Sequence, residues 1–144
     1  MNKKRLLKLA DLLEADANNP NGLKFDMGTW GESSGETAEI SCGTRACAMG
    51  LAALSGAFKR QGLHYEITGD PYSTATFIDI NFKDEVYSDG MESAEKLFGI
   101  TDQESEFLFD DNSYPQRYKT GKRAELYVAK RIRDFVAGKV GPQE

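Results

Sequence analysis

The chain has 144 residues, of which 40% are apolar and 28% are charged, and its formal net charge is −5. This composition predicts one globular domain over residues 1–144, large enough to bury a hydrophobic core. Apolar runs of membrane-spanning length are missing, and Asp11 and Glu14 follow the basic N-terminus too closely for a signal peptide, so we expect a cytoplasmic protein.

The first predicted element is an amphipathic helix over residues 3–16. Its apolar positions recur at helical spacing, at Leu6, Leu9, Ala10, Leu13 and Ala17. The Asn-Asn-Pro-Asn-Gly segment at 18–22 should end this helix, because these residues favour turns. Residues 23–41 are then predicted to be extended or looped.

An almost uncharged run over residues 41–58 predicts a central helix. Large side chains recur on one side at Cys47, Leu51, Leu54 and Phe58, and small residues recur on another side at Ala46, Gly50, Ala53 and Ala57. A helix that is apolar nearly all round is expected to be buried, with its small side against a neighbouring helix. Gly62 is the predicted C-terminal cap.

Residues 63–82 predict a β-hairpin, because two runs rich in β-branched and aromatic residues flank a turn at 69–74. In the second strand, Ile78, Ile80 and Phe82 should face the core. Since isolated hairpins are marginal, we expect this one to pack on helices. A further strand would come either from the region before Cys42 or from a second subunit in a homo-oligomer.

Three more helices complete the prediction. Residues 91–98 carry an apolar edge that Gly99 ends, Thr101 and Glu104 form a capping box for the next helix, and residues 120–137 form the last one. Residues 138–144 are predicted to be a flexible tail. The fold class is therefore α+β, a mainly helical single domain around a buried central helix with a β-hairpin insertion.

Charge is distributed unevenly along the second half of the chain. Residues 79–111 hold eleven acidic residues and two lysines, whereas residues 117–139 hold eight basic and two acidic residues. The two segments either neutralise each other on folding or form an interaction surface. Few aromatic residues accompany the basic ones, which disfavours nucleic acid as the partner.

Several short motifs run through the chain: Phe25-Asp26-Met27-x-x-Trp30, Cys42-Gly43-Thr44-x-Ala46-Cys47-x-x-Gly50, Leu97-Phe98-Gly99-Ile100 and Tyr114-Pro115. Together, over about residues 5–137, they resemble a family of small bacterial and phage proteins without an assigned activity. The resemblance implies no enzymatic activity. For a phage protein of this size it implies work in the host cytoplasm, either sequestering a signalling nucleotide or blocking a host protein.

The predicted functional site lies at the start of the central helix. Gly43, Thr44 and Arg45 would combine free backbone N–H groups, a hydroxyl and a cation, which are the components of an anion site, and Cys42 and Trp30 would line it. An aromatic wall beside a helix terminus suits a base attached to phosphate. We therefore predict a non-enzymatic protein that binds a small anionic, nucleotide-like ligand, with ordinary helix capping as the alternative for these residues.

The sequence is also compatible with two other functions. A protein-interaction module would use the hairpin edge or the acidic surface to engage a host protein. A hydrolase would use Cys42 as the nucleophile and His64, the one histidine, as its base. Cys42, Cys47 and His64 do not make a standard four-ligand zinc site, so the sequence predicts no metal and no cofactor.

Overall fold

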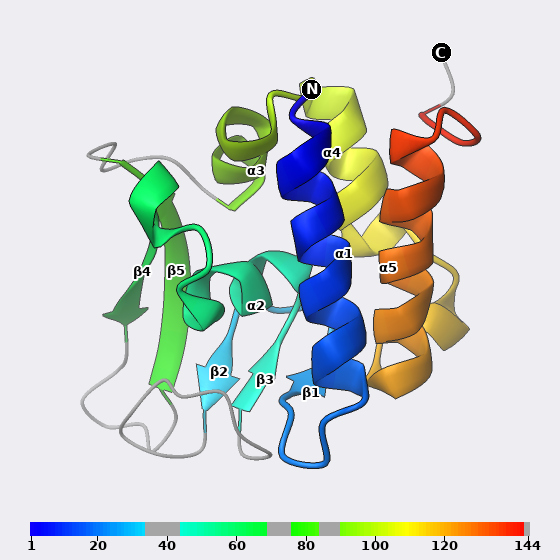
Figure 1. The fold of residues 1–144 in the computed structure, drawn as a ribbon. Helices are drawn as coiled ribbons and strands as arrows, with labels where there is room; N and C mark the ends of the chain where they lie inside the picture. Colours follow the sequence, from blue (N-terminus) through cyan, green and yellow to red (C-terminus); the bar gives the residue numbers. More distant parts are fainter. Residues whose placement is uncertain (34–43, 69–75, 84–89, 143–144) are drawn as a thin grey trace.

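The computed structural model describes residues 1–33, 44–68, 76–83 and 90–142, which form a mainly helical α+β fold (Figure 1). The helices are α1 (Lys3–Ala17), α2 (Ala48–Ser55), α3 (Gly90–Phe98), α4 (Asp102–Phe109) and α5 (Gly121–Val136). The strands are β1 (Lys24–Phe25), β2 (Glu32–Ser33), β3 (Thr44–Ala46), β4 (Leu63–Thr68) and β5 (Thr76–Phe82). Short 3₁₀ turns are η1 (Lys59–Gln61), η2 (Asp111–Ser113) and η3 (Gln116–Tyr118).

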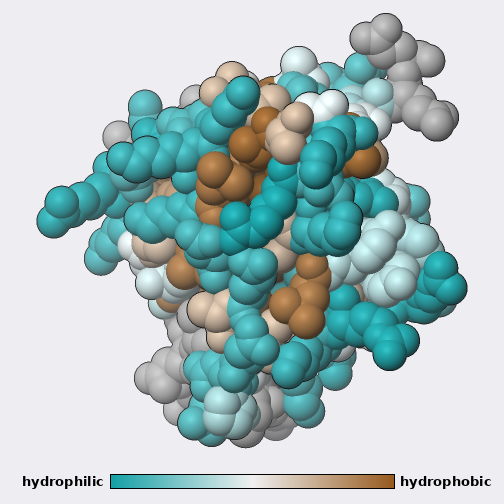
Figure 2. All heavy atoms as spheres, turned by 45° about the vertical axis from the view of Figure 1, so that its right-hand side comes forward, coloured by the Kyte–Doolittle hydropathy of each residue, from teal (hydrophilic) through white to brown (hydrophobic). Residues whose placement is uncertain are grey.

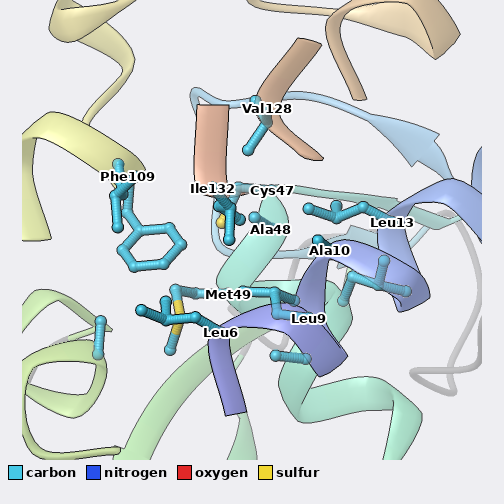
Figure 3. Close-up of a cluster of buried hydrophobic side chains, with 14 of the residues drawn as sticks. Leu6, Leu9, Ala10, Leu13, Cys47, Ala48, Met49, Phe109, Val128 and Ile132 are labelled. Atoms are coloured by element: carbon cyan, nitrogen blue, oxygen red, sulfur yellow. The ribbon is translucent and has the colours of Figure 1, made fainter. Parts of the chain in front are cut away.

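The two long helices α1 and α5 lie side by side along one flank of the molecule (Figure 1). Both predicted helices are confirmed, and their apolar stripes are buried as expected. Across this contact Arg133 of α5 pairs with Asp11 and Glu14 of α1. Figure 3 shows side chains of α1, α2 and α5 gathered in one core, with Phe109 of α4 beside them.

The acidic segment, residues 79–111, contains the two predicted helices, α3 and α4. Gly99, at φ +62°, turns the chain between them, and Thr101 and Glu104 form the expected capping box. The guanidinium of Arg131 in α5 donates to the carbonyl oxygens of Phe107 and Ser113, at 3.0 and 2.9 Å. Arg131 therefore binds main-chain carbonyl oxygens, and Arg133 binds the carboxylates of α1. Neither contact is an ion pair with a carboxylate of residues 79–111.

The central helix is buried but much shorter than predicted. Helix α2 begins at Ala48, with Cys47 as its N-cap, and it ends at Ser55, with Gly56 at φ +73° as its C-cap. The residues before it form β3 instead, because they find strand partners on both sides. Gly62, at φ +106°, caps η1 and not the central helix.

The strands form one five-stranded sheet in the order β1-β3-β2-β5-β4. β1 and β3 are parallel, and the other neighbours are antiparallel. The predicted hairpin is confirmed as β4 and β5, and a strand from before Cys42, β2, extends its sheet as one alternative predicted. Ile80 and Phe82 are buried as expected. Asn81, which was predicted to face away from the core, is buried too.

Trp30 fixes the position of α2. A Cβ atom at Gly50 would lie 1.7 Å from the Trp30 carbonyl oxygen, and one at Gly90 would lie 2.6 Å from its indole ring. The small side of α2 therefore meets the main chain of Trp30, where the sequence predicted a neighbouring helix. Only glycine allows such a close approach at Gly50.

This contact predicts a large effect of Gly50→Ala on stability. The added methyl group must push Trp30 or α2 aside, so we expect the free energy of unfolding to fall by about 3 kcal/mol or more. Urea denaturation measures this change. Gly141→Ala is the matched control, because open space surrounds Gly141. Equal stability of the two variants would contradict the close approach of Trp30 to Gly50.

Candidate functional site

Thr44 and Arg45 do not lie at the start of a helix, where the sequence predicted them to form an anion site. Thr44 and Arg45 belong to β3, and consecutive side chains of a strand point to opposite faces. Thr44 is accordingly buried, whereas Arg45 is exposed. The two side chains therefore do not converge at a helix terminus. Cys42 and Gly43 lie outside the described residues.

Arg45 instead pairs with two carboxylates. Its Nη1 lies 3.3 Å from Oε1 of Glu32, its cross-strand neighbour, and its Nε lies 3.9 Å from Oδ2 of Asp26. Half-exposed pairs of this kind contribute little stability, so a competing anion would displace them at small cost. The guanidinium of Arg45 therefore has carboxylate partners within the chain.

Trp30 lines a different pocket from Arg45. That pocket, of about 410 Å³, is formed by the chain around Trp30 together with Asp79, Asp110 and Asp111. Its carboxylates make it unsuitable for an anion. The structure therefore separates the predicted aromatic wall from the predicted cation.

The residues of the hydrolase alternative are also only partly described. His64 lies on β4 opposite Asn81, and its Nδ1 is 3.1 Å from the carbonyl oxygen of Gly62. Cys47 is buried, and its sulfur accepts a hydrogen bond from the Gly50 N–H. Since Cys42 lies outside the described residues, a Cys42–His64 pair stays a prediction.

A second pocket, of about 840 Å³, opens where α1 ends and α5 begins, at the lower end of both helices in Figure 1. The loop from α1 to β1 forms one wall, and β1 and the start of α5 form the others. Three cations line it, Lys24, Arg45 and Lys122, and so does Asp26.

Two buried carboxyl groups, those of Asp16 and Glu125, also line this pocket. Their residues are 9% and 2% exposed. The Leu23 N–H donates to Oδ1 of Asp16 at 3.2 Å, whereas Oδ2 of Asp16 and Oε2 of Glu125 have no hydrogen-bond partner. Buried polar atoms are nearly always paired, so this arrangement requires an explanation.

A shared proton explains the pair in the absence of a ligand. Burial raises the pKa of Glu125 far above its ordinary value, and the neighbouring Asp16 carboxyl raises it further through a hydrogen bond and charge repulsion. A protonated Glu125 can donate to Asp16, whereas two buried carboxylates would repel each other. At neutral pH Glu125 therefore keeps its proton, which it can share with Asp16.

The sequence contains a signal for this pair that the predictions above did not include. Glu125 precedes Val128, Ala129 and Ile132 by three, four and seven positions, so it lies on the apolar stripe of α5. Asp16 continues the stripe of Leu9 and Leu13 on α1 in the same way. A carboxyl at the end of an apolar stripe indicates a buried acid, and the contact of the two helices brings both acids together.

The part of the chain that the structure describes contains no cluster of three or more His, Cys, Asp or Glu residues suited to a metal ion. Among its helices, none has the length and apolar character that crossing a membrane requires. No protein-family model, curated protein or solved structure matches this chain. Membership of the family of small bacterial and phage proteins that the motifs resemble therefore stays a prediction.

The carboxyl pair predicts how stability depends on pH. Between the ordinary pKa of Glu125 in the unfolded chain, about 4.5, and its raised pKa in the folded protein, folding takes up a proton. The free energy of unfolding should therefore fall as pH rises, by up to about 1.4 kcal/mol per pH unit from this residue. Glu125→Gln should remove this contribution, because the amide donates to Asp16 at every pH.

Urea denaturation between pH 5 and 9 measures this effect, with Glu106→Gln as the control because Glu106 is exposed on α4. We expect Glu125→Gln to gain stability over the wild type progressively as pH rises, and Glu106→Gln to follow the wild type. A pH dependence unchanged by Glu125→Gln would show that Glu125 is ionised in the folded protein.

Cys47 is predicted to be unreactive in the folded protein. Burial raises its thiol pKa from 9.0 to about 11, which lowers the thiolate fraction about a hundredfold. In a Cys42→Ser variant, where Cys47 is the one remaining thiol, a disulfide reagent should react much faster in urea than in buffer. Equal rates would mean that Cys47 is accessible.

Proposed function

We propose that this protein is a non-enzymatic binding protein that holds a small anionic molecule in the pocket between α1, β1 and α5. The observation that carries the proposal is the combination, in one pocket of about 840 Å³, of three cations and a buried carboxyl pair. Pockets of this volume suit molecules of nucleotide or sugar-phosphate size.

The cations support an anionic group on the ligand. Lys24 and Lys122 are exposed, and no ion pair occupies either of them among the described residues. Arg45 has only half-exposed pairs to lose. A carboxylate or phosphate at this position gains charge-assisted hydrogen bonds, each of which contributes about 1.5–3 kcal/mol.

The carboxyl pair supports a second requirement for the ligand. Oδ2 of Asp16 and Oε2 of Glu125 have no partner besides the proton that the two carboxyl groups share, so the buried end of the ligand should carry N–H or O–H donors that can take its place. A nucleobase, a sugar or an amine satisfies this condition, whereas a hydrocarbon chain does not. A nucleotide-like ligand is therefore retained, at a different place from the predicted helix terminus.

The surface features favour a small ligand over a protein partner. The face shown in Figure 2 is mostly hydrophilic, and its apolar side chains lie in small separate patches. Among the described residues, the exposed large hydrophobic side chains are Met1, Leu126 and Val140. Protein-binding faces usually present larger apolar areas.

The interaction-module alternative uses either the acidic surface or the edge of the hairpin, which is strand β4. This strand lies at the end of the sheet order and pairs with β5 on one side, and sheet edges can add a strand from a partner. Binding of a host protein at β4 would leave the α1–α5 pocket without a role. The experiment below separates the two functions.

The test is calorimetric titration of the full chain with nucleoside monophosphates, sugar phosphates and dicarboxylic acids. At least one compound should bind, and the double variant Lys24→Glu with Lys122→Glu should weaken its binding tenfold or more, because two attractive charges become repulsive. The control is Lys4→Glu with Lys59→Glu, an equal change of charge at exposed residues outside the pocket.

The control variant should bind as the wild type does. Equal losses in both double variants would assign binding to overall charge and not to the pocket. If no compound of the panel binds to the wild type, the proposed function is wrong, and capture of a partner at β4 becomes the function to test.

A further inference from the structure

The buried end of the pocket presents carboxyl oxygens that require hydrogen-bond donors. Gly22 closes one side of Asp16, since a Cβ atom there would lie 2.5 Å from its carbonyl oxygen and 2.9 Å from its Oδ1. The Leu23 N–H already donates to that oxygen. Oδ2 of Asp16 and Oε2 of Glu125 are the acceptors that remain.

Within the described part of the chain, no cation satisfies these two oxygens. The charged groups that line the pocket with the pair are Lys24 of β1, Asp26 after it, Arg45 of β3 and Lys122 of α5. Among the described residues, neither lysine nor Arg45 pairs with Asp16 or Glu125, and Arg45 pairs with Asp26 and Glu32 instead. The pair is therefore available to a cation from outside.

From this geometry we infer that the ligand carries a protonated amine, which binds between Asp16 and Glu125 and replaces the proton that they share. The inference rests on the proposed function and makes it more specific. An ammonium group has three N–H donors in a compact volume, so it can bind both unpaired oxygens at once. The anionic group of the same molecule then meets Lys24 and Lys122.

The exchange balances in charge. Without ligand the pair holds one proton and a charge of −1; with the amine it holds two carboxylates and one ammonium, again −1. The O–H bond of Glu125 breaks, its proton goes to solvent, and no other bond changes. A cation thus enters the pocket without leaving an uncompensated buried charge, which would be costly.

Proton release makes binding depend on pH in a defined way. As long as the ligand amine stays protonated and Glu125 stays protonated in the free protein, the association constant should rise about tenfold per pH unit. A ligand that only accepts or donates neutral hydrogen bonds at the pair would show no such rise.

Matched compounds that differ by one amine test the inference. The pairs are glucosamine 6-phosphate with glucose 6-phosphate, phosphoethanolamine with ethyl phosphate, and glutamate with glutarate. Calorimetry on the full chain at pH 6 and pH 7 gives, for each pair, the ratio of the two association constants. This ratio cancels the titration of the shared phosphate or carboxylate.

We expect the amine to strengthen binding tenfold or more for at least one pair, with a ratio that rises about tenfold from pH 6 to pH 7. Glu125→Gln, which has no proton to release, should abolish the rise, whereas Glu106→Gln should keep it. A pH indicator in weakly buffered solution should report one proton released per bound amine by the wild type, which tests the exchange without any variant.

The outcomes separate the two proposals. If amine-free compounds bind as tightly as their partners and depend on Lys24 and Lys122, the pocket binds anions and the inference is wrong. If amines bind more tightly without proton release, the proposed exchange of proton for ammonium is wrong. If neither these compounds nor the wider panel bind, both the proposed function and the inference are wrong.

Discussion

The contact between α1 and α5 is the interaction on which the rest of the structure depends. It brings the first and last helices of the described chain together and packs their apolar stripes into the core beside α2. Both stripes finish in a carboxyl group, and the contact therefore buries Asp16 against Glu125 at the open end. Replacing the pair by apolar residues would remove a desolvation cost, so a contribution to stability does not by itself explain it.

The close approach of Trp30 to Gly50 connects this helical layer to the sheet. Trp30 precedes β2. The N–H of Cys47, the N-cap of α2, donates to the carbonyl oxygen of Thr29, the residue before Trp30, at 2.9 Å. The start of α2 is thus fixed from outside the helix. β1 and β3 hold Lys24 and Arg45 in register as strand neighbours, which places both cations at one wall of the pocket.

Local patterns predicted the elements whose stability is local. The stripes of α1 and α5, the Thr101 capping box and the β4–β5 hairpin all follow from spacing along the chain. The error at residues 44–46 has a physical cause: a run as short as Thr-Arg-Ala has no periodicity that separates a helix from a strand, and only pairing with β1 and β2 decides. The carboxyl pair was missed for the same reason, because a contact between helices far apart in sequence creates it.

The central claim is that two buried carboxyl groups share one proton at neutral pH and so form a site for a cation. Carbon-13 NMR of the side-chain carboxyl groups, followed from pH 3 to pH 9 in the free protein, tests it most directly. Because burial and Asp16 raise the pKa of Glu125, its signal should keep the chemical shift of a protonated acid through pH 7. A Glu125 signal that titrates near its ordinary pKa of about 4.5, with both carboxyls ionised at pH 7, would contradict the account.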